Sequence, residues 1–183
     1  MDGIHEILNA LDRLSADDVL ATVIRVEGSA YRKAGASMVF KDDGATIGLI
    51  SAGCLETDLS IRAKELKGKK TSETIVYDMR AEDDLAWGQG AGCNGRVSVL
   101  LEPIDVYLHD HLCKLKNCLE SGNRVTQIKK LNKEHSVSDY LFLKGDHDFF
   151  GVWHGPIPAM VKDLLRGFHR NFSKNGIVSV PEL

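Results

Sequence analysis

The sequence predicts an α/β or α+β fold, in which helices flank a mixed β-sheet within a single compact domain. Segments with helical periodicity alternate along the chain with short runs that are rich in β-branched residues. The 183 residues are enough to bury a complete hydrophobic core. A composition of 43% hydrophobic and 27% charged residues is ordinary for a globular protein.

The first half of the chain alternates helical and strand patterns. Apolar residues between Ile4 and Leu14 recur at i, i+3, i+4 and i+7, which predicts an opening helix. Residues 19–26 are nearly all apolar, which is typical of a strand buried on both faces. A second helix is expected over residues 54–67, before the stop signal Gly68. Further strands are expected at 37–40, 45–50, 73–77 and 96–101, the first two around an Asp-Gly turn.

The second half repeats this alternation. One helix is expected over residues 108–119 with Asp105 as its N-cap, and another over 157–168 after two prolines. Strands are expected at 125–131, 137–143 and 177–180. We therefore treat residues 1–183 as one domain, in which 19–103 carry the conspicuous motifs and 104–183 complete the fold.

Charge and the N-terminal sequence exclude several classes of protein. The net charge of −3 argues against a nucleic-acid-binding protein that works through a basic surface. The opening residues lack the basic and apolar regions of a signal peptide, and no apolar run reaches the roughly 18–20 residues of a transmembrane helix. We expect a cytoplasmic protein without a membrane partner, whose four cysteines are free thiols and not a disulfide framework.

The segment Ser51-Ala52-Gly53-Cys54-Leu55-Glu56 is the first candidate for chemistry. It joins a predicted strand to a predicted helix, so Cys54 is expected near the positive end of the helix dipole, where thiolates are favoured. Gly53 would let a ligand approach the backbone. Glu56 and Asp58 add negative charge there and would resist an anionic ligand. The alternative is a small buried cysteine that packs at a helix start.

The second candidate is the glycine-rich segment Trp87-Gly88-Gln89-Gly90-Ala91-Gly92-Cys93-Asn94-Gly95. Alternating glycines allow the backbone to form N–H concavities that accept anions. Residues 90–95 satisfy Gly-x-Gly-x-x-Gly, but a dinucleotide fingerprint opens a helix, and here a strand is predicted to follow. Because Trp87 and Cys93 lie among these glycines, we favour a shaped pocket, with a flexible loop as the alternative.

Weaker signals come from one basic loop and from the remaining cysteines. Arg32 and Lys33 follow the first buried strand between two glycines, where they could meet a phosphate or form a plain surface loop. Cys113 and Cys118 are five residues apart on a predicted helix and are expected to pack. Neither His-Glu-x-x-His nor Cys-x-x-Cys occurs, so no metal site is predicted.

Taken together, these segments resemble a known family. The motifs occur in the order Gly28-Ser29-Ala30-x-Arg32-Lys33-x-Gly35, Ser51-x-Gly53-Cys54-Leu55-Glu56, Tyr77-Asp78, Asp83-Asp84, Trp87-Gly88-x-Gly90-x-Gly92-Cys93-Asn94-Gly95 and Leu100-Leu101-Glu102-Pro103. This series resembles the XdhC/CoxI family of molybdenum cofactor accessory proteins, the xanthine dehydrogenase accessory factors.

The resemblance implies a handler of molybdenum cofactor (molybdopterin) rather than a metabolic enzyme. Family members are thought to bind the cofactor, support its sulfuration by a cysteine desulfurase and pass it to a molybdenum hydroxylase such as xanthine dehydrogenase. A homodimer is also considered. By motif, two thiols would face the cofactor, glycine and asparagine groups would hydrogen-bond it, and an arginine would meet its phosphate or pterin. The expected cofactor-binding residues are Arg32, Gly53, Cys54, Glu56, Gly92, Cys93, Asn94 and Gly95.

The sequence departs from the family pattern at several positions. It carries Ala52 where members usually have Gly, Tyr31 where they usually have Pro, and Ala91 where they have a bulky apolar residue. Many members continue into a Rossmann-like second domain, and nothing after Gly95 fits its glycine signature. The resemblance therefore implies the N-terminal domain of the family only.

Two other functional classes remain open at this point. In the first, the protein is a thiol-dependent enzyme in which Cys54 is the nucleophile and a histidine such as His154 is the base. In the second, it is a regulatory remnant that binds no cofactor.

Overall fold

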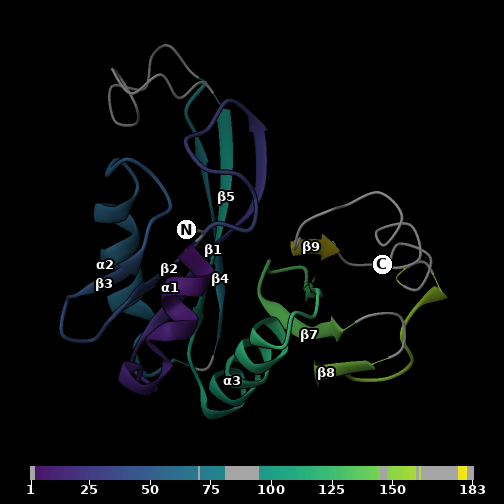
Figure 1. Cartoon of the computed structure of the whole chain (residues 1–183). Helices are drawn as coiled ribbons and strands as arrows, with labels where there is room; N and C mark the ends of the chain where they lie inside the picture. The colour runs from purple at the N-terminus through teal and green to yellow at the C-terminus, as the bar shows by residue number, and fades with distance from the viewer. Residues whose placement is uncertain are drawn as a thin grey trace.

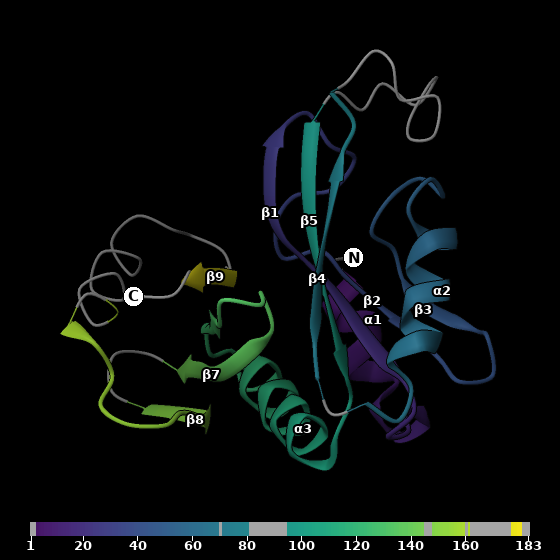
Figure 2. The same cartoon turned by 180° about the vertical axis from the view of Figure 1, so that it is seen from behind.

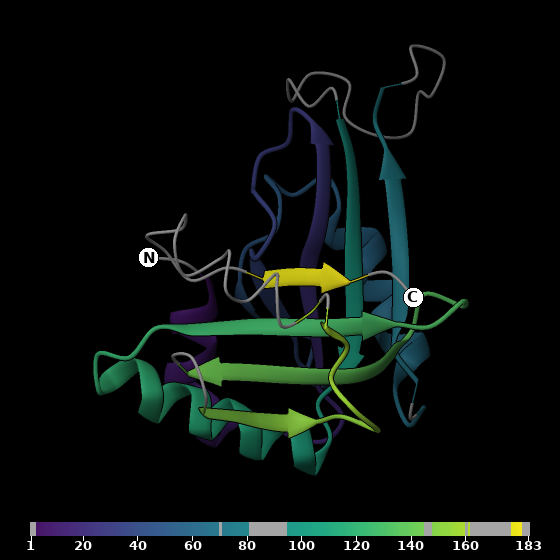
Figure 3. The same cartoon turned by 90° about the vertical axis from the view of Figure 1, so that its right-hand side faces the viewer.

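The strands that the structure describes form two sheets that cross one another, as Figure 3 shows. The computed structural model describes residues 3–69, 71–80, 95–144, 148–159, 161 and 177–180. The first sheet has the strand order β3-β2-β1-β5-β4, and the second has the order β8-β7-β6-β9. The helices pack against these sheets, which confirms the predicted class of α/β or α+β fold (Figure 1).

All strand pairs of the first sheet are antiparallel. Its strands are β1 (Val19–Gly28), β2 (Ser37–Phe40), β3 (Thr46–Gly48), β4 (Glu73–Asp78) and β5 (Gly95–Pro103). The predicted hairpin is present, since β2 pairs with β3 around Gly44, whose φ of 87° suits glycine.

The second sheet is mixed, and its composition corrects one expectation. Its strands are β6 (Val125–Leu131), β7 (Val137–Lys144), β8 (Asp148–Val152) and β9 (Ile177–Val180). Only β6 and β9 run parallel, whereas β6–β7 and β7–β8 are antiparallel. We expected one mixed sheet, and the described strands divide into this mixed sheet and a purely antiparallel one. Periodicity locates strands in the sequence but does not say which of them pair.

The helices lie on opposite sides of the first sheet. They are α1 (Gly3–Asn9), the short 3-10 helix η1 (Leu11–Arg13), α2 (Glu56–Leu66) and α3 (Val106–Glu120). In Figure 2, α2 lies on one side of this sheet, while α3 and the second sheet lie on the other. The predicted N-cap of α3 is confirmed, because Asp105 accepts a hydrogen bond from the Leu108 N–H at 2.7 Å. No helix in the described part of the chain has the length and apolar character needed to cross a membrane.

β1 separates the two main hydrophobic cores. Its first six residues are buried, as the apolar run predicted. Val19, Ala21 and Val23 belong to the core beneath α2, while Leu20 belongs to the core beneath α1 and α3. This second core also includes Phe142 of β7, so the second sheet shares buried apolar surface with the first.

A buried ion pair joins the two sheets. Lys129 of β6 contacts Glu102 of β5, and their side chains are only 1% and 7% exposed. Charges that are removed from water require such a partner, because an unpaired buried charge is costly. The pair therefore links one particular position of β6 to one particular position of β5.

In the second half of the chain, the sequence predicts one further helix and does not predict one strand. The helix expected over residues 157–168 lies mostly outside the described residues. β8 was not predicted, because its five residues Asp148-Phe149-Phe150-Gly151-Val152 show no alternation of apolar and polar residues. Gly151 allows the close approach of β8 to β7, since a Cβ there would lie 2.3 Å from the Tyr140 carbonyl oxygen.

We predict that the two sheets depend on the complete ion pair. Lys129→Met leaves Glu102 buried without a partner and should lower the free energy of unfolding by about 3–5 kcal/mol. The double variant Lys129→Met/Glu102→Leu should recover most of this loss, because no charge remains buried. Urea unfolding measures both effects.

Lys114→Met provides the control, because it removes a solvent-exposed partner of Asp110. It should change the free energy of unfolding by less than about 1 kcal/mol. A double variant no more stable than Lys129→Met would contradict the prediction.

Candidate functional site

The loop before α2 is held by the side chain of Glu56. Its carboxylate accepts hydrogen bonds from the Ser51 N–H at 2.6 Å, the Gly53 N–H at 3.1 Å and the Ser51 hydroxyl. Ser51 Oγ in turn accepts a hydrogen bond from the Leu55 N–H at 3.1 Å. Gly53 has a φ of 105°, a conformation that favours glycine. The loop that carries Cys54 is thus fixed by one carboxylate.

Glu56 has an unusual electrostatic environment. Burial by itself would raise the pKa of Glu56, but the hydrogen bonds from the Ser51 hydroxyl and backbone outweigh it and lower that pKa below its usual value. Because the Gly53 N–H donates its hydrogen bond to the Glu56 carboxylate, these two groups position the loop in this structure. Direct contact of Gly53 or Glu56 with the cofactor stays a prediction.

Cys54 lies just outside α2, which begins at Glu56 rather than at Cys54 as expected. It is half-buried and packs against the core beneath α2. The thiol lines a small pocket together with Arg32, Ser51 and Met79. The pocket holds only about 10 Å³, which is the space of one water molecule. A larger molecule could contact Cys54 only from outside this pocket.

Arg32 is brought to the same pocket by a loop that folds back on β1. The Gly35 N–H donates to the Val23 carbonyl at 2.8 Å, and the Val23 N–H donates to the Ala36 carbonyl at 2.9 Å. Within the described residues, the buried Nε of Arg32 has no hydrogen-bond partner, although the guanidinium lies 5.9 Å from the ring centre of Tyr31. A cation with an unused buried donor is suited to bind an anion.

Gly95 has a packing role in this structure. It pairs with Gly28 at the end of β5, and a Cβ on Gly95 would lie within 2.6 Å of the carbonyl oxygens of Glu27 and Ser29. Any side chain at this position would push the Arg32 loop away. Gly92, Cys93 and Asn94 lie outside the described residues, so their expected contacts with the cofactor stay predictions.

The sequence did not predict a hydrogen-bonded group that joins α2 to β4. Asp58 of α2 accepts hydrogen bonds from the Tyr77 hydroxyl at 2.6 Å and from Arg62 Nε at 2.7 Å. Burial and the neighbouring carboxylate raise the pKa of Tyr77 far above its usual value. These bonds attach α2 to β4. The spacing of Asp58 and Arg62 was the available signal, since residues at i and i+4 are neighbours on a helix.

The described residues do not pair Cys54 with a histidine. His154 instead bonds Asp139 through both its backbone N–H and its Nδ1, each at 2.7 Å, in the second sheet. The enzyme hypothesis therefore receives no geometric support here. Cys113 and Cys118 pack against the core beneath α3, as expected. No group of three potential metal ligands gathers among the described residues.

We predict that Glu56→Gln weakens the loop that carries Cys54. The loss of the charge-assisted hydrogen bonds should lower the free energy of unfolding by about 1–2 kcal/mol at neutral pH. Because the folded-state pKa of Glu56 is lowered, its contribution is complete above the ordinary glutamate pKa of about 4.3. It disappears as the pH falls through the folded-state pKa.

Urea unfolding as a function of pH tests this, with exposed Glu65→Gln on the same helix as the control. A difference between wild type and Glu56→Gln that stays constant into acid would contradict the assignment.

We further predict that Tyr77→Phe loosens α2. The variant removes a buried hydrogen bond to a carboxylate and should lower the free energy of unfolding by about 1.5–3 kcal/mol. The exposed Tyr107→Phe serves as the control and should have no measurable effect. Equal thermal unfolding of Tyr77→Phe and wild type would show that this bond does not stabilise the fold.

Comparisons with known proteins place the chain among its relatives. Residues 15–78 match the XdhC and CoxI family, and residues 107–183 match the BH1974-like central domain. Over 166 residues the chain is 48% identical to a probable xanthine dehydrogenase subunit of Bacillus subtilis, and this match covers 91% of this chain and 48% of that protein. Over 59 residues it is 37% identical to the molybdenum cofactor insertion chaperone PaoD of Escherichia coli, which is 32% of this chain and 19% of that protein.

The fold has a counterpart of known structure. A crystal structure described as a xanthine dehydrogenase from Bacillus halodurans matches with a TM-score of 0.76 and 43% sequence identity, over 96% of this chain and 50% of that chain. The chain thus spans about half the length of the Bacillus proteins that it matches. Residues 15–78 contain the Arg32 loop and the Cys54 segment on which the resemblance was based. Over residues 15–78 the chain therefore matches the XdhC and CoxI family, to which the motifs pointed.

Proposed function

We propose that this protein binds molybdenum cofactor as cargo, assists its sulfuration and helps to insert it into a xanthine-dehydrogenase-type molybdenum hydroxylase. The observation that carries the proposal is the placement of Cys54 and Arg32 around one pocket, where the Nε of Arg32 has no hydrogen-bond partner among the described residues. The name of the E. coli relative as a cofactor insertion chaperone supports the same role.

The residues present suit this cargo chemically. Molybdenum cofactor is anionic through its phosphate and carries a metal bound by soft sulfur ligands. A guanidinium whose Nε has no partner in the described part of the chain suits the phosphate, and a thiolate suits the metal or its sulfur chemistry. Cys54 and Arg32 would be the contact residues, while Glu56 would position the loop between them through Ser51 and Gly53.

The small pocket beside Cys54 limits how the cargo can bind. Its volume of about 10 Å³ cannot enclose a pterin, so the cargo would lie over the thiol rather than within the protein core. Gly92, Cys93 and Asn94, which directly precede β5 in the sequence, are proposed to complete the site, and Gly95 to let the Arg32 loop pack closely on β5. In this arrangement the chain is a cofactor carrier and catalyses no reaction by itself.

The proposed partners follow from the cargo. A molybdenum hydroxylase would receive the cofactor, which agrees with the xanthine dehydrogenase names of the Bacillus relatives. A cysteine desulfurase would supply the terminal sulfur, and the carrier could act as a homodimer.

Purification from a host that makes molybdenum cofactor tests the proposal. The chain should retain molybdenum and a pterin, measured by metal analysis and by fluorescence of the oxidised pterin. Cys54→Ser and Arg32→Gln should each reduce retention by about tenfold, which is the loss of about 1.4 kcal/mol of binding free energy.

Cys118→Ser is the matched control, because this thiol packs on α3 and should leave retention unchanged. Wild-type protein that retains no molybdenum, or a Cys54→Ser variant that retains as much as wild type, would overturn the proposed site.

A further inference from the structure

A second cavity, larger than the Cys54 pocket, lies on the other side of β1. Leu20 and Thr22 line this cavity, whereas Val23 lines the pocket of Cys54. Successive residues of a strand face opposite sides of the sheet, which places the two hollows on opposite faces. The cavity measures about 480 Å³, within the range of small-molecule sites.

One wall of the cavity is apolar. It is formed where α3, the start of β6 and the C-terminal half of β7 approach β1, and it consists of Leu20, Leu112, Leu115, Leu119, Val125 and Phe142. Several of these side chains also belong to the core beneath α1 and α3. The cavity is therefore a gap in packed apolar surface. An aromatic ring or a short apolar chain of a ligand that entered it would be removed from water.

The opposite wall is polar and cationic. It is formed by residues 31–37, which include Arg32 and Lys33, and Thr22 and Gln127 add hydrogen-bonding groups. Neither Arg32 nor Lys33 forms an ion pair with any described residue. A protein of net charge −3 thus presents two cations, with no carboxylate partner in the described part of the chain, beside one apolar hollow.

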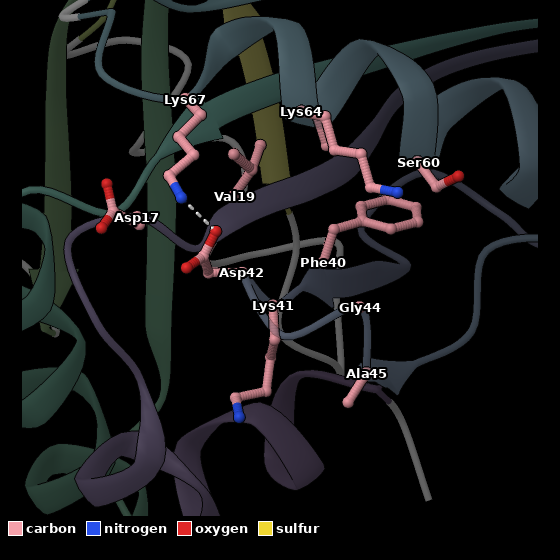
Figure 4. Close-up of a pocket in the computed structure, with 11 residues that line it drawn as sticks. Asp17, Val19, Phe40, Lys41, Asp42, Gly44, Ala45, Ser60, Lys64 and Lys67 are labelled. Atoms are coloured by element: carbon pink, nitrogen blue, oxygen red, sulfur yellow. Dashed lines mark hydrogen bonds and ion pairs between the residues drawn. The ribbon is translucent and has the colours of Figure 1, made fainter.

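The lysine-rich cavity of Figure 4 provides a contrast. Lys67 lies 2.5 Å from Asp42 there, and Lys41 pairs with Asp43 at 2.7 Å. Asp17 also lines this cavity, which measures about 90 Å³. Its positive charges are largely neutralised by neighbouring carboxylates, and it is too small for a ring. Of these two cavities, only the larger combines unpaired cations with apolar space.

We propose that the larger cavity is a binding site for a small anionic molecule with an apolar or aromatic body. The anionic group would lie against Arg32 and Lys33, and the body would fill the space against α3 and Phe142. Charge-assisted hydrogen bonds to Arg32 and Lys33 would then orient the ligand, and burial of its apolar body would supply affinity. The proposal stands on the lining of this cavity and does not require the function proposed for Cys54.

Fluorescence titration of the full chain with two matched probes tests the site. The first probe is 8-anilinonaphthalene-1-sulfonate, an aromatic anion, and the second is N-phenyl-1-naphthylamine, which has the same ring system without the charge. We expect one saturable sulfonate site per chain. The double variant Arg32→Gln/Lys33→Gln should weaken sulfonate binding by about tenfold or more and leave the uncharged probe within about twofold.

A steric variant tests the location independently. Leu119 is half-buried at the cavity wall, so Leu119→Trp should fill the hollow without disrupting the core, and both probes should lose binding. Circular dichroism and urea unfolding establish that the variant is folded. Lys64→Gln, which removes a cation from the cavity of Figure 4, should not alter binding of the sulfonate.

The outcomes separate this proposal from the cofactor function. Cys54→Ser should bind the sulfonate as wild type does, even if it fails to retain molybdenum. Unsaturable or multiple-site binding would overturn the cavity proposal. So would equal sulfonate binding by wild type and the double variant, or by wild type and a folded Leu119→Trp variant.

Discussion

The burial of β1 on both faces is the constraint on which the rest of the structure depends. A strand with apolar side chains on both sides cannot leave either face in water without losing the free energy of apolar burial. Val19, Ala21 and Val23 require α2, and Leu20 requires α1, α3 and part of the second sheet. The two-sheet architecture meets this requirement. Lys129 and Glu102 then fix where β6 crosses β5, because neither charge has another ion-pair partner among the described residues.

The same strand organises both hollows. The loop that carries Arg32 leaves the end of β1, where Gly28 pairs with Gly95, and folds back to bond the backbone of Val23. Arg32 consequently lines the Cys54 pocket on one face and the large cavity on the other. A single cation at the edge of the sheet is therefore available to ligands on either side.

The two proposals use different physics. The site beside Cys54 has little enclosed volume and depends on the chemistry of its donors, with Glu56 using its charge to shape the loop rather than to attract a ligand. The large cavity has ample apolar surface and depends on removing a ring from water while its anionic group is neutralised. A carrier of an anionic, ring-containing cofactor could use both the donors beside Cys54 and the apolar surface of the large cavity. Each hollow can nevertheless be tested without the other.

By itself, the sequence determined the local structure of the protein and its likeness to a known family. Patterns of apolar spacing located most helices and strands, Asp105 marked the start of α3, and the motifs around Arg32 and Cys54 lie in the stretch that matches the XdhC and CoxI family, because each of these signals lies within a short stretch of chain. Only the tertiary structure decided the features that depend on contacts between residues far apart in the sequence. It divided the strands between two sheets, united Lys129 with Glu102, turned Gly95 into a packing residue and left Arg32 beside an open cavity. No periodicity encodes these contacts, since their energy depends on groups that are far apart in the chain and adjacent only after folding.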